Sequence, residues 1–138
     1  MAKQFTLGKN ERLKSSKGIE QLFTQGQRLG MFPFQVRYLF TATLPQAPAG
    51  ALQCGVTVST RNFKKAVHRN RIKRLLREAW RLQKNELQEQ VAGRPDSLLV
   101  FLIYTGKELP AFSLVKEKVG LIIQKLIQIH HESIAAGA

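Results

Sequence analysis

The 138-residue chain has few of the side chains that protein enzymes use to cleave phosphodiester bonds. It contains one Asp (Asp96), one Cys (Cys54) and three His, and its eight Glu are scattered. Hydrolysis by protein groups alone needs clustered carboxylates that hold metal ions, or a paired acid and base. No Gly-rich loop ending in Gly-Lys-Ser or Gly-Lys-Thr is present. The sequence therefore offers no candidate protein active site and no metal site, and one Cys excludes an intrachain disulfide.

Long apolar runs are absent as well. None approaches the roughly 18 residues that a membrane-spanning helix needs, and the first residues lack the apolar core of a secretory signal. We therefore expect a cytoplasmic protein with no membrane contact. Cys54 stands in an apolar run and is expected to be a small buried side chain.

Negative charge is scarce, whereas positive charge is abundant. The chain has 22 Lys and Arg against 9 Asp and Glu, a formal net charge of +13 and a pI near 10.5. The charge concentrates at Arg61–Arg81, where nine of 21 residues are Lys or Arg and one, Glu78, is acidic. This distribution indicates a polyanionic partner, because binding phosphates relieves the self-repulsion of the compact chain.

The spacing of apolar residues predicts the element order α-β-β-α-β-α in one domain, residues 1–138, with flexible ends at about 1–10 and 132–138. The predicted elements are a helix from Ser15 or Ser16 that stops at Gly26, strands at 34–44 and 51–59, a helix at 67–90, a strand at 97–105, and a last helix that starts at Pro110 to Ser113. We expect the first two strands to form an antiparallel hairpin. Strand 97–105 is continuously apolar, which predicts a central position, parallel to a neighbour. The fold class is then α+β, an α/β sandwich around a mixed sheet.

The predicted helix at 67–90 has an apolar side and a basic side. At about 100° per residue, one arc collects the residues that would dock the helix on the sheet. These are Ile72, Leu75, Leu76, Ala79 and Leu82. Most cations lie opposite, but Arg71 falls on the far shoulder of the apolar stripe. Trp80 lies at the edge of the stripe, and we interpret it as core packing rather than as a platform for base stacking.

The basic residues suit RNA. Arg offers planar paired hydrogen bonds to phosphate, Lys offers a point charge, and the Asn70 amide can bind a base edge or a sugar hydroxyl. The candidate RNA-binding residues are Arg61, Lys64, Lys65, Arg69, Asn70, Arg71, Lys73, Arg74, Arg77 and Arg81. A second candidate surface is the strand face with Phe34, Val36 and Tyr38, where exposed aromatic rings would stack on unpaired bases. The alternative for that face is hydrophobic core.

The segment Ala66–Glu78 reads A-x-x-R-N-x-x-K-R-x-x-R-E, which resembles the signature of the bacterial ribonuclease P protein subunit. The likeness extends over nearly the whole chain. Arg12–Arg28 resembles the family's N-terminal helix and the glycine after it, and Val56–Ser59 and Leu99–Phe101 resemble the strands around the signature. The segment 60–65 departs from many members, because it lacks their glycine and is one residue longer.

The resemblance implies a left-handed βαβ crossover through helix 67–90, against the usual right-handed preference. It also implies a protein that binds a catalytic RNA and the 5′ leader of precursor tRNA, and that assists endonucleolytic removal of the leader to give mature 5′ ends. The basic helix would face the RNA subunit. A cleft between the first helix and the sheet would contact the leader, with candidates Phe23, Phe34, Val36 and Tyr38. Catalysis would belong to the RNA, which would hold most of the Mg²⁺, and the protein alone would be monomeric.

Two other functions fit the composition. A structural rRNA-binding protein with no role in cleavage would share the positive charge. A membrane-active amphipathic helix would share the two-sided helix. The buried strand at 97–105 and the second hydrophobic helix argue against the membrane alternative, because they indicate a folded sandwich.

Overall fold

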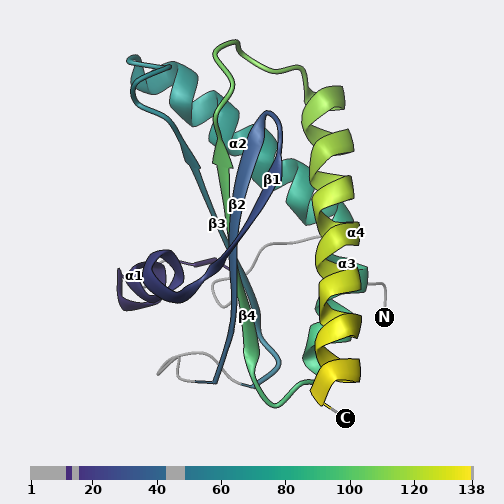
Figure 1. The fold of residues 1–138 in the computed structure, drawn as a ribbon. Helices are drawn as coiled ribbons and strands as arrows, with labels where there is room; N and C mark the ends of the chain where they lie inside the picture. Colours follow the sequence, from purple (N-terminus) through teal and green to yellow (C-terminus); the bar gives the residue numbers. More distant parts are fainter. Residues whose placement is uncertain (1–11, 14–15, 43–48, 138) are drawn as a thin grey trace.

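The computed structural model describes residues 12–13, 16–42 and 49–137. Within these residues the chain forms a four-stranded sheet with helices on both faces (Figure 1). The elements are α1 Ser16–Gln25, β1 Gln27–Met31, β2 Phe34–Thr41, β3 Leu52–Val58, α2 Ala66–Gln83, α3 Asn85–Ala92, β4 Ser97–Tyr104 and α4 Phe112–Gly137. The α+β class and the mixed sheet are as predicted, while the handedness of the crossover stays a prediction.

The strand order is β1-β2-β4-β3. β4 pairs antiparallel with β2 and parallel with β3, so its predicted central position and parallel neighbour are confirmed. Its side chains are buried on both faces of the sheet, with Val100 and Leu102 on one face and Leu99 on the other. A strand with two buried faces needs apolar residues at successive positions, which explains the uninterrupted apolar run.

The predicted hairpin between strands 34–44 and 51–59 is wrong. β2 forms its hairpin with β1, a strand that the sequence pattern did not predict, and β4 separates β2 from β3. β1 is short and largely exposed, so its sequence Gln27–Met31 carries little hydrophobic signal. Its pairing with β2 holds it at the sheet edge, where polar side chains are tolerated.

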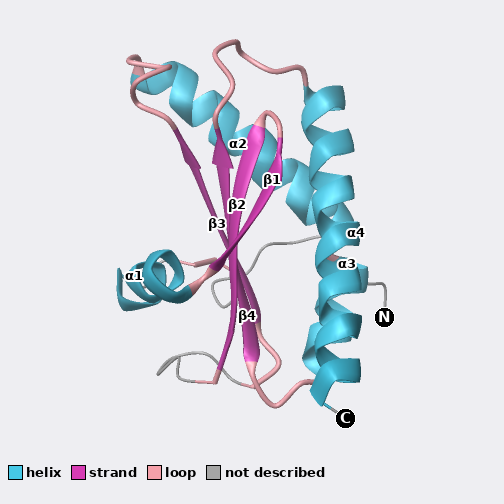
Figure 2. Ribbon diagram, viewed as in Figure 1, coloured by secondary structure: helices cyan, strands magenta, loops and turns pink. Residues whose placement is uncertain are grey.

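The two faces of the sheet differ in their cover, as Figure 2 shows. α2, α3 and α4 pack on one face and form the main core with Val36, Val100 and Leu102. α1 packs on the other face, where Leu22, Leu13 and Leu99 form a smaller cluster. A helix covers only a strip of a sheet, so among the described residues the single short helix α1 leaves part of the second face open.

The predicted helix at 67–90 is divided in two at Lys84. The Lys84 amide still donates to the Trp80 carbonyl at 2.9 Å, and α3 starts at the next residue. Lys84 is buried, and its Nζ donates to Gln88 Oε1 at 2.9 Å. A lysine can bury its aliphatic stem while its ammonium is hydrogen-bonded, which sequence periodicity does not reveal.

The C-terminal end of the described chain is one long helix, α4. α4 continues to Gly137, and the flexibility of residues 132–138 stays a prediction, while His130 just before them is 2% exposed. Arg94 holds this end of α4, because its Nη1 lies 3.0 Å from His130 Nδ1 while Asp96 pairs with its Nε at 2.7 Å. The predicted flexible residues 1–10, and residue 138, lie outside the described part of the chain. Among the described residues, no helix is long and apolar enough to cross a membrane.

Candidate nucleic-acid interface

α2 has a buried apolar side and an exposed basic side. The apolar side fixes the helix on the core, and the basic side faces outward. Ile72, Leu76, Ala79 and Trp80 are at most 1% exposed and dock the helix against β3 and α4. The interpretation of Trp80 as core packing is therefore confirmed. Four predicted RNA-binding residues of the helix are exposed, which leaves their side chains accessible to a polyanion. They are Asn70, Arg71, Arg74 and Arg77.

The first turns of α2 carry a shallow hollow, lined by Val67, His68, Asn70, Arg71 and Arg74. The sequence pattern placed Arg71 on a different side of the helix from Asn70 and Arg74. In the structure all three residues line this hollow. Val67 is 68% exposed beside them, so the surface combines an apolar contact, an amide and two guanidinium groups. No side chain caps the start of α2 at Lys65, so the first backbone amides are open to a phosphate as well.

Three other predicted residues of α2 are less accessible. Lys73 is partly buried. Arg69 Nη1 donates to the backbone carbonyls of Phe63 and Lys64, so part of its hydrogen-bonding capacity is used within the protein. Arg81 is paired with Glu78, and this hydrogen bond lowers the pKa of the Glu78 carboxyl and raises the pKa of the Arg81 guanidinium. The charge of Arg81 is thus offset locally.

The segment before α2 is anchored although it lacks the family's common glycine. Phe63 is buried near Tyr104, with ring centroids 6.1 Å apart. The Asn62 amide donates to the carbonyls of Thr105 at 3.1 Å and Gly106 at 3.3 Å. These contacts fix the path of the segment and leave its predicted RNA-binding side chains exposed. They are Arg61, Lys64 and Lys65.

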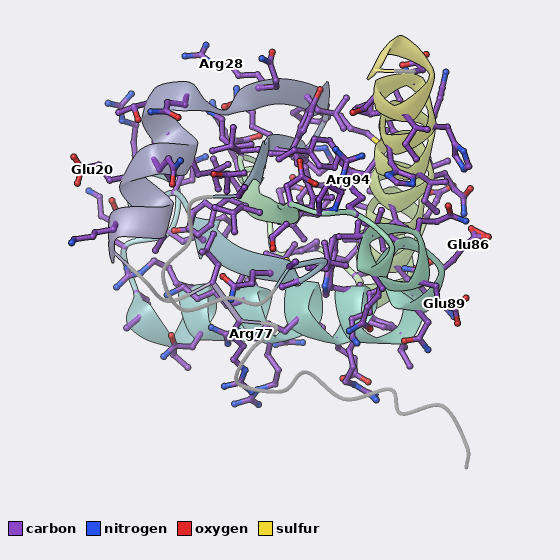
Figure 3. All side chains as sticks on the ribbon, turned by 90° about the horizontal axis from the view of Figure 1, so that it is seen from below. Glu20, Arg28, Arg77, Glu86, Glu89 and Arg94 are labelled. Atoms are coloured by element: carbon purple, nitrogen blue, oxygen red, sulfur yellow. The ribbon has the colours of Figure 1, made fainter. Side chains whose placement is uncertain are left out.

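The basic surface is bounded by acidic residues at α3. Figure 3 shows Arg77 extending outward from α2, whereas Glu86 and Glu89 extend from the outer side of α3. Both Glu side chains are exposed. The break at Lys84 therefore coincides with a change in the sign of surface charge, and a polyanion is favoured on α2 rather than on α3.

A second candidate surface lies on the opposite face of the sheet, beside α1. Phe23 is 38% exposed and meets Phe101 edge-on, with ring centroids 5.3 Å apart. The Arg37 guanidinium lies 5.2 Å from the Phe23 ring centroid, and its Nη1 donates to the Phe23 carbonyl at 3.3 Å. An exposed ring beside a cation is suited to an unpaired nucleotide, whose base stacks while its phosphate is neutralised.

Three of the four predicted cleft residues are on the wrong face. Phe34 and Val36 are 1% exposed in the main core, and Tyr38 packs against that core from β2. They point away from α1, so the prediction that they line the cleft is corrected. Because successive strand residues alternate between faces, it is Arg37 that faces α1. Phe101 was missed for the same reason, and its alternation with the buried Val100 and Leu102 was the available signal.

The two surfaces meet at the edge of β3. One hollow of about 200 Å³ is lined by Arg77 of α2, by Arg12 and by Phe101. The backbone of Arg12 pairs with that of Cys54 in β3. Gly55 forms its floor, where a larger side chain would overlap the Phe101 ring. Cys54 is buried, as predicted, and burial raises the pKa of its thiol, which makes the thiol unreactive. Arginine side chains thus line a path from one surface to the other.

The described residues of the two surfaces offer a metal ion no group of ligands. Within the described residues, no three His, Cys, Asp or Glu side chains come together in a way that could hold one. Glu78, the acidic residue of α2, is paired with Arg81 instead.

A family model and several known proteins match most of this chain. A Ribonuclease P family model matches residues 7–126 of the chain. The ribonuclease P protein component of Porphyromonas gingivalis is 34% identical over 112 residues, 81% of this chain and 80% of that protein. The corresponding protein of Chlorobium phaeobacteroides is 30% identical over 128 residues, 88% of each.

Solved structures show the same fold. The RNase P protein from Thermotoga maritima superposes with a TM-score of 0.61 at 23% identity, covering 83% of this chain and 96% of that one. The RNase P protein of Staphylococcus aureus gives a TM-score of 0.60 at 17% identity, covering 87% and 97%.

Proposed function

The chain belongs to the ribonuclease P protein family, and we propose that its two surfaces contact different RNAs. The protein is a subunit of ribonuclease P, the ribonucleoprotein that removes the 5′ leader of precursor tRNA by endonucleolytic cleavage. Its partners are the catalytic RNA subunit and precursor tRNA. In this family catalysis belongs to the RNA, so the protein contributes binding rather than reactive groups.

The outward side of α2 binds the RNA subunit in this proposal. The observation that carries it is the hollow on α2, where Asn70, Arg71 and Arg74 are exposed together beside Val67. Guanidinium groups form paired hydrogen bonds with phosphate, and an amide can read a base edge or a 2′-hydroxyl. The exposed cations before the helix, Arg61, Lys64 and Lys65, extend the same surface. Arg69 contributes mainly by holding this segment, and Arg81 contributes least because Glu78 offsets its charge.

The face beside α1 binds the single-stranded leader. Phe23 supplies an exposed ring, Phe101 supports that ring from the sheet, and Arg37 places a cation next to it. Unpaired bases stack on aromatic rings without strong preference for sequence, which suits leaders of varied sequence. Arg12 and Arg77 at the β3 edge would carry phosphates between the two RNAs.

Three further properties belong to the proposal. Mg²⁺ is the ion of the holoenzyme and is held mainly by RNA phosphates, in keeping with the scattered acidic residues of the protein. The protein is monomeric before it binds RNA, since its high positive charge opposes self-association. It works in the cytoplasm, where a bacterial cell makes precursor tRNA.

Cleavage assays with and without the RNA subunit test the α2 assignment. The full chain alone should cleave nothing, and it should raise cleavage of precursor tRNA by its RNA at low Mg²⁺. The triple variant Asn70→Ala, Arg71→Ala, Arg74→Ala should lose most of that stimulation. The variant Lys116→Ala, Lys125→Ala removes the same number of positive charges from exposed positions of α4 and is the control. Equal stimulation by the triple variant and the control would contradict the assignment.

The alternative of a structural rRNA-binding protein is not favoured. The matched relatives are ribonuclease P protein components, and this chain matches them over most of their length. Sequencing of the RNA that copurifies with the full chain separates the two functions. We expect enrichment of the ribonuclease P RNA and of leader-containing tRNA. Enrichment of ribosomal RNA alone would contradict the ribonuclease P assignment of this chain.

A further inference from the structure

Phe32 is the most exposed of the large apolar side chains in the described residues, at 80%. It stands at the turn between β1 and β2, and it lines neither the hollow on α2 nor the hollow beside Phe101. A phenylalanine so exposed gives up the free energy of burial. Exposed apolar rings with a polar surround commonly mark contact sites for a partner.

The turn that carries Phe32 is held firmly. The Pro33 carbonyl accepts two hydrogen bonds from Thr105, from its amide at 2.8 Å and from its Oγ1 at 3.0 Å. Pro33 itself is buried. The backbone on which the ring stands is therefore tied to the loop after β4, so little backbone freedom is lost when a partner binds.

The Phe32 ring borders a hollow of about 470 Å³ that the loop after β4 and the start of α4 complete. Its apolar walls include Tyr104 and Leu114, and its charged residues are Lys107, Lys118 and Glu108, a net charge of +1. The Tyr104 hydroxyl donates to the Glu108 carbonyl at 2.7 Å, which leaves the aromatic part of Tyr104 as the wall. A volume in this range is typical of sites that bind small-molecule ligands.

This hollow adjoins the basic segment before α2. The Asn62 amide donates to the carbonyls of Thr105 and Gly106, and both of these residues line the hollow. Arg61 directly precedes Asn62 in the sequence, so the basic segment begins next to this site. The turn at Phe32, the loop after β4 and the start of α2 all lie at one end of the molecule (Figure 1). The hollow also includes α4 residues, which places it on the α2 side of the sheet and not on the α1 side.

We propose that the Phe32 hollow binds one unpaired nucleotide of the RNA subunit. The base stacks on the Phe32 ring and enters the apolar hollow, and Lys107 and Lys118 bind its phosphate. RNA is favoured over an apolar partner because two lysines line the hollow against one acidic residue, and because Asn62 ties the hollow to the basic segment that starts at Arg61. The inference rests on the proposed function in one respect, that the RNA subunit lies against the α2 side.

Binding of the full chain to the ribonuclease P RNA tests this site. Phe32→Ala should weaken binding about tenfold at fixed salt, the size expected for loss of one stacked base. Phe32→Trp should bind like the original chain, because it restores an aromatic surface. Leu121→Ala is the matched control, because it also truncates an exposed apolar side chain, but one on α4 outside the hollow. Chemical probing should reveal an unpaired nucleotide of the RNA subunit that is protected in the complex with the original chain and reactive in the Phe32→Ala complex.

Several outcomes would overturn the proposal. One is a Phe32→Ala affinity and reactivity pattern equal to that of Leu121→Ala. Another is a loss of affinity that appears only with leader-containing tRNA, which would assign the ring to the leader. A shift of the free protein's oligomeric state by Phe32→Ala would assign it to a second copy of the chain.

Two further variants keep the test decisive. If Phe32→Ala fails to fold, Lys107→Gln with Lys118→Gln tests the same nucleotide through its phosphate, and unchanged binding and reactivity would overturn the proposal. Failure of the α2 assignment is recognised separately, because the Asn70, Arg71 and Arg74 triple variant would then bind the RNA normally whatever Phe32 does.

Discussion

Arg69 Nη1 donates a hydrogen bond to the carbonyl of Phe63 at 2.8 Å, and a second to the carbonyl of Lys64 at 2.7 Å. An arginine of the basic signature therefore holds the segment that leads into its own helix. Phe63 is buried, so the bond connects the signature to the core. Arg74, one helical turn further on, is exposed, with no hydrogen bond of its side chain among those found in the described residues.

Arg69→Ala and Arg74→Ala should consequently differ. Arg69→Ala should lower the free energy of unfolding by about 1.5–3 kcal/mol, the usual range for hydrogen bonds to a charged group. It should also weaken RNA binding. Arg74→Ala should leave stability within about 0.5 kcal/mol and reduce the slope of log affinity against log salt by about one. Urea denaturation and salt titrations measure the two effects, and equal stability of both variants would contradict a structural role of Arg69.

Phe23→Ala should weaken binding of precursor tRNA by about 1–3 kcal/mol, the range for loss of a stacked base. Binding of mature tRNA, which has no leader, should be unchanged, and Phe23→Tyr should restore binding of the precursor. The contrasting variant is Phe34→Ala, which should cost about 3–5 kcal/mol of stability because it empties a core position. If Phe23→Ala weakened both tRNAs equally, the assignment of this face to the leader would be wrong.

Gly55→Ala should disturb the same surface indirectly. A methyl group at Gly55 would overlap the Phe101 ring, and Phe101 supports Phe23. We expect a loss of precursor affinity smaller than that of Phe23→Ala, with no loss for mature tRNA. Gly30→Ala is the control, since nothing lies near a methyl group there. Equal leader affinity in both glycine variants would show that the Phe101 position is unimportant.

Stability should fall at mildly acid pH because of His130. Burial lowers its pKa, the positive charges of Arg94 and His131 lower it further, and Asp96 acts in the opposite direction. The unfolded chain, with a histidine pKa of about 6.5, then takes up the proton first as pH falls. The stabilisation from neutral His130 is complete above that value and is lost below it.

Thermal unfolding of the original chain and of His130→Gln between pH 8 and pH 5 checks this expectation. The difference in midpoint between the two proteins should shrink as pH falls, because the variant has no proton to bind at this position. Other titrating groups affect both proteins alike. A difference that stays constant with pH would contradict the role given to His130.

Local patterns predicted the elements whose environment is simple. Strand 97–105 is apolar at successive positions because both of its faces are buried, and β4 occupies the centre of the sheet. The apolar side of the basic helix likewise matched the buried Ile72, Leu76 and Ala79. The helix break was missed because Lys84 is buried through its stem and hydrogen-bonded through its ammonium. β1 was not predicted because it becomes a strand through its pairing with β2, and not through an apolar pattern of its own.

The family, the basic helix and the central strand follow from the sequence alone, since these depend on residues close together in the chain. The pairing of the strands, and the face of the sheet that the described helices leave open, depend on contacts between distant parts of the chain and are seen only in the structure. A strand alternates its side chains between two faces, and the alternation does not say which face a helix will cover. That is why Phe34 and Val36 proved to be core, while Phe101, Arg37 and Phe23 form the exposed surface.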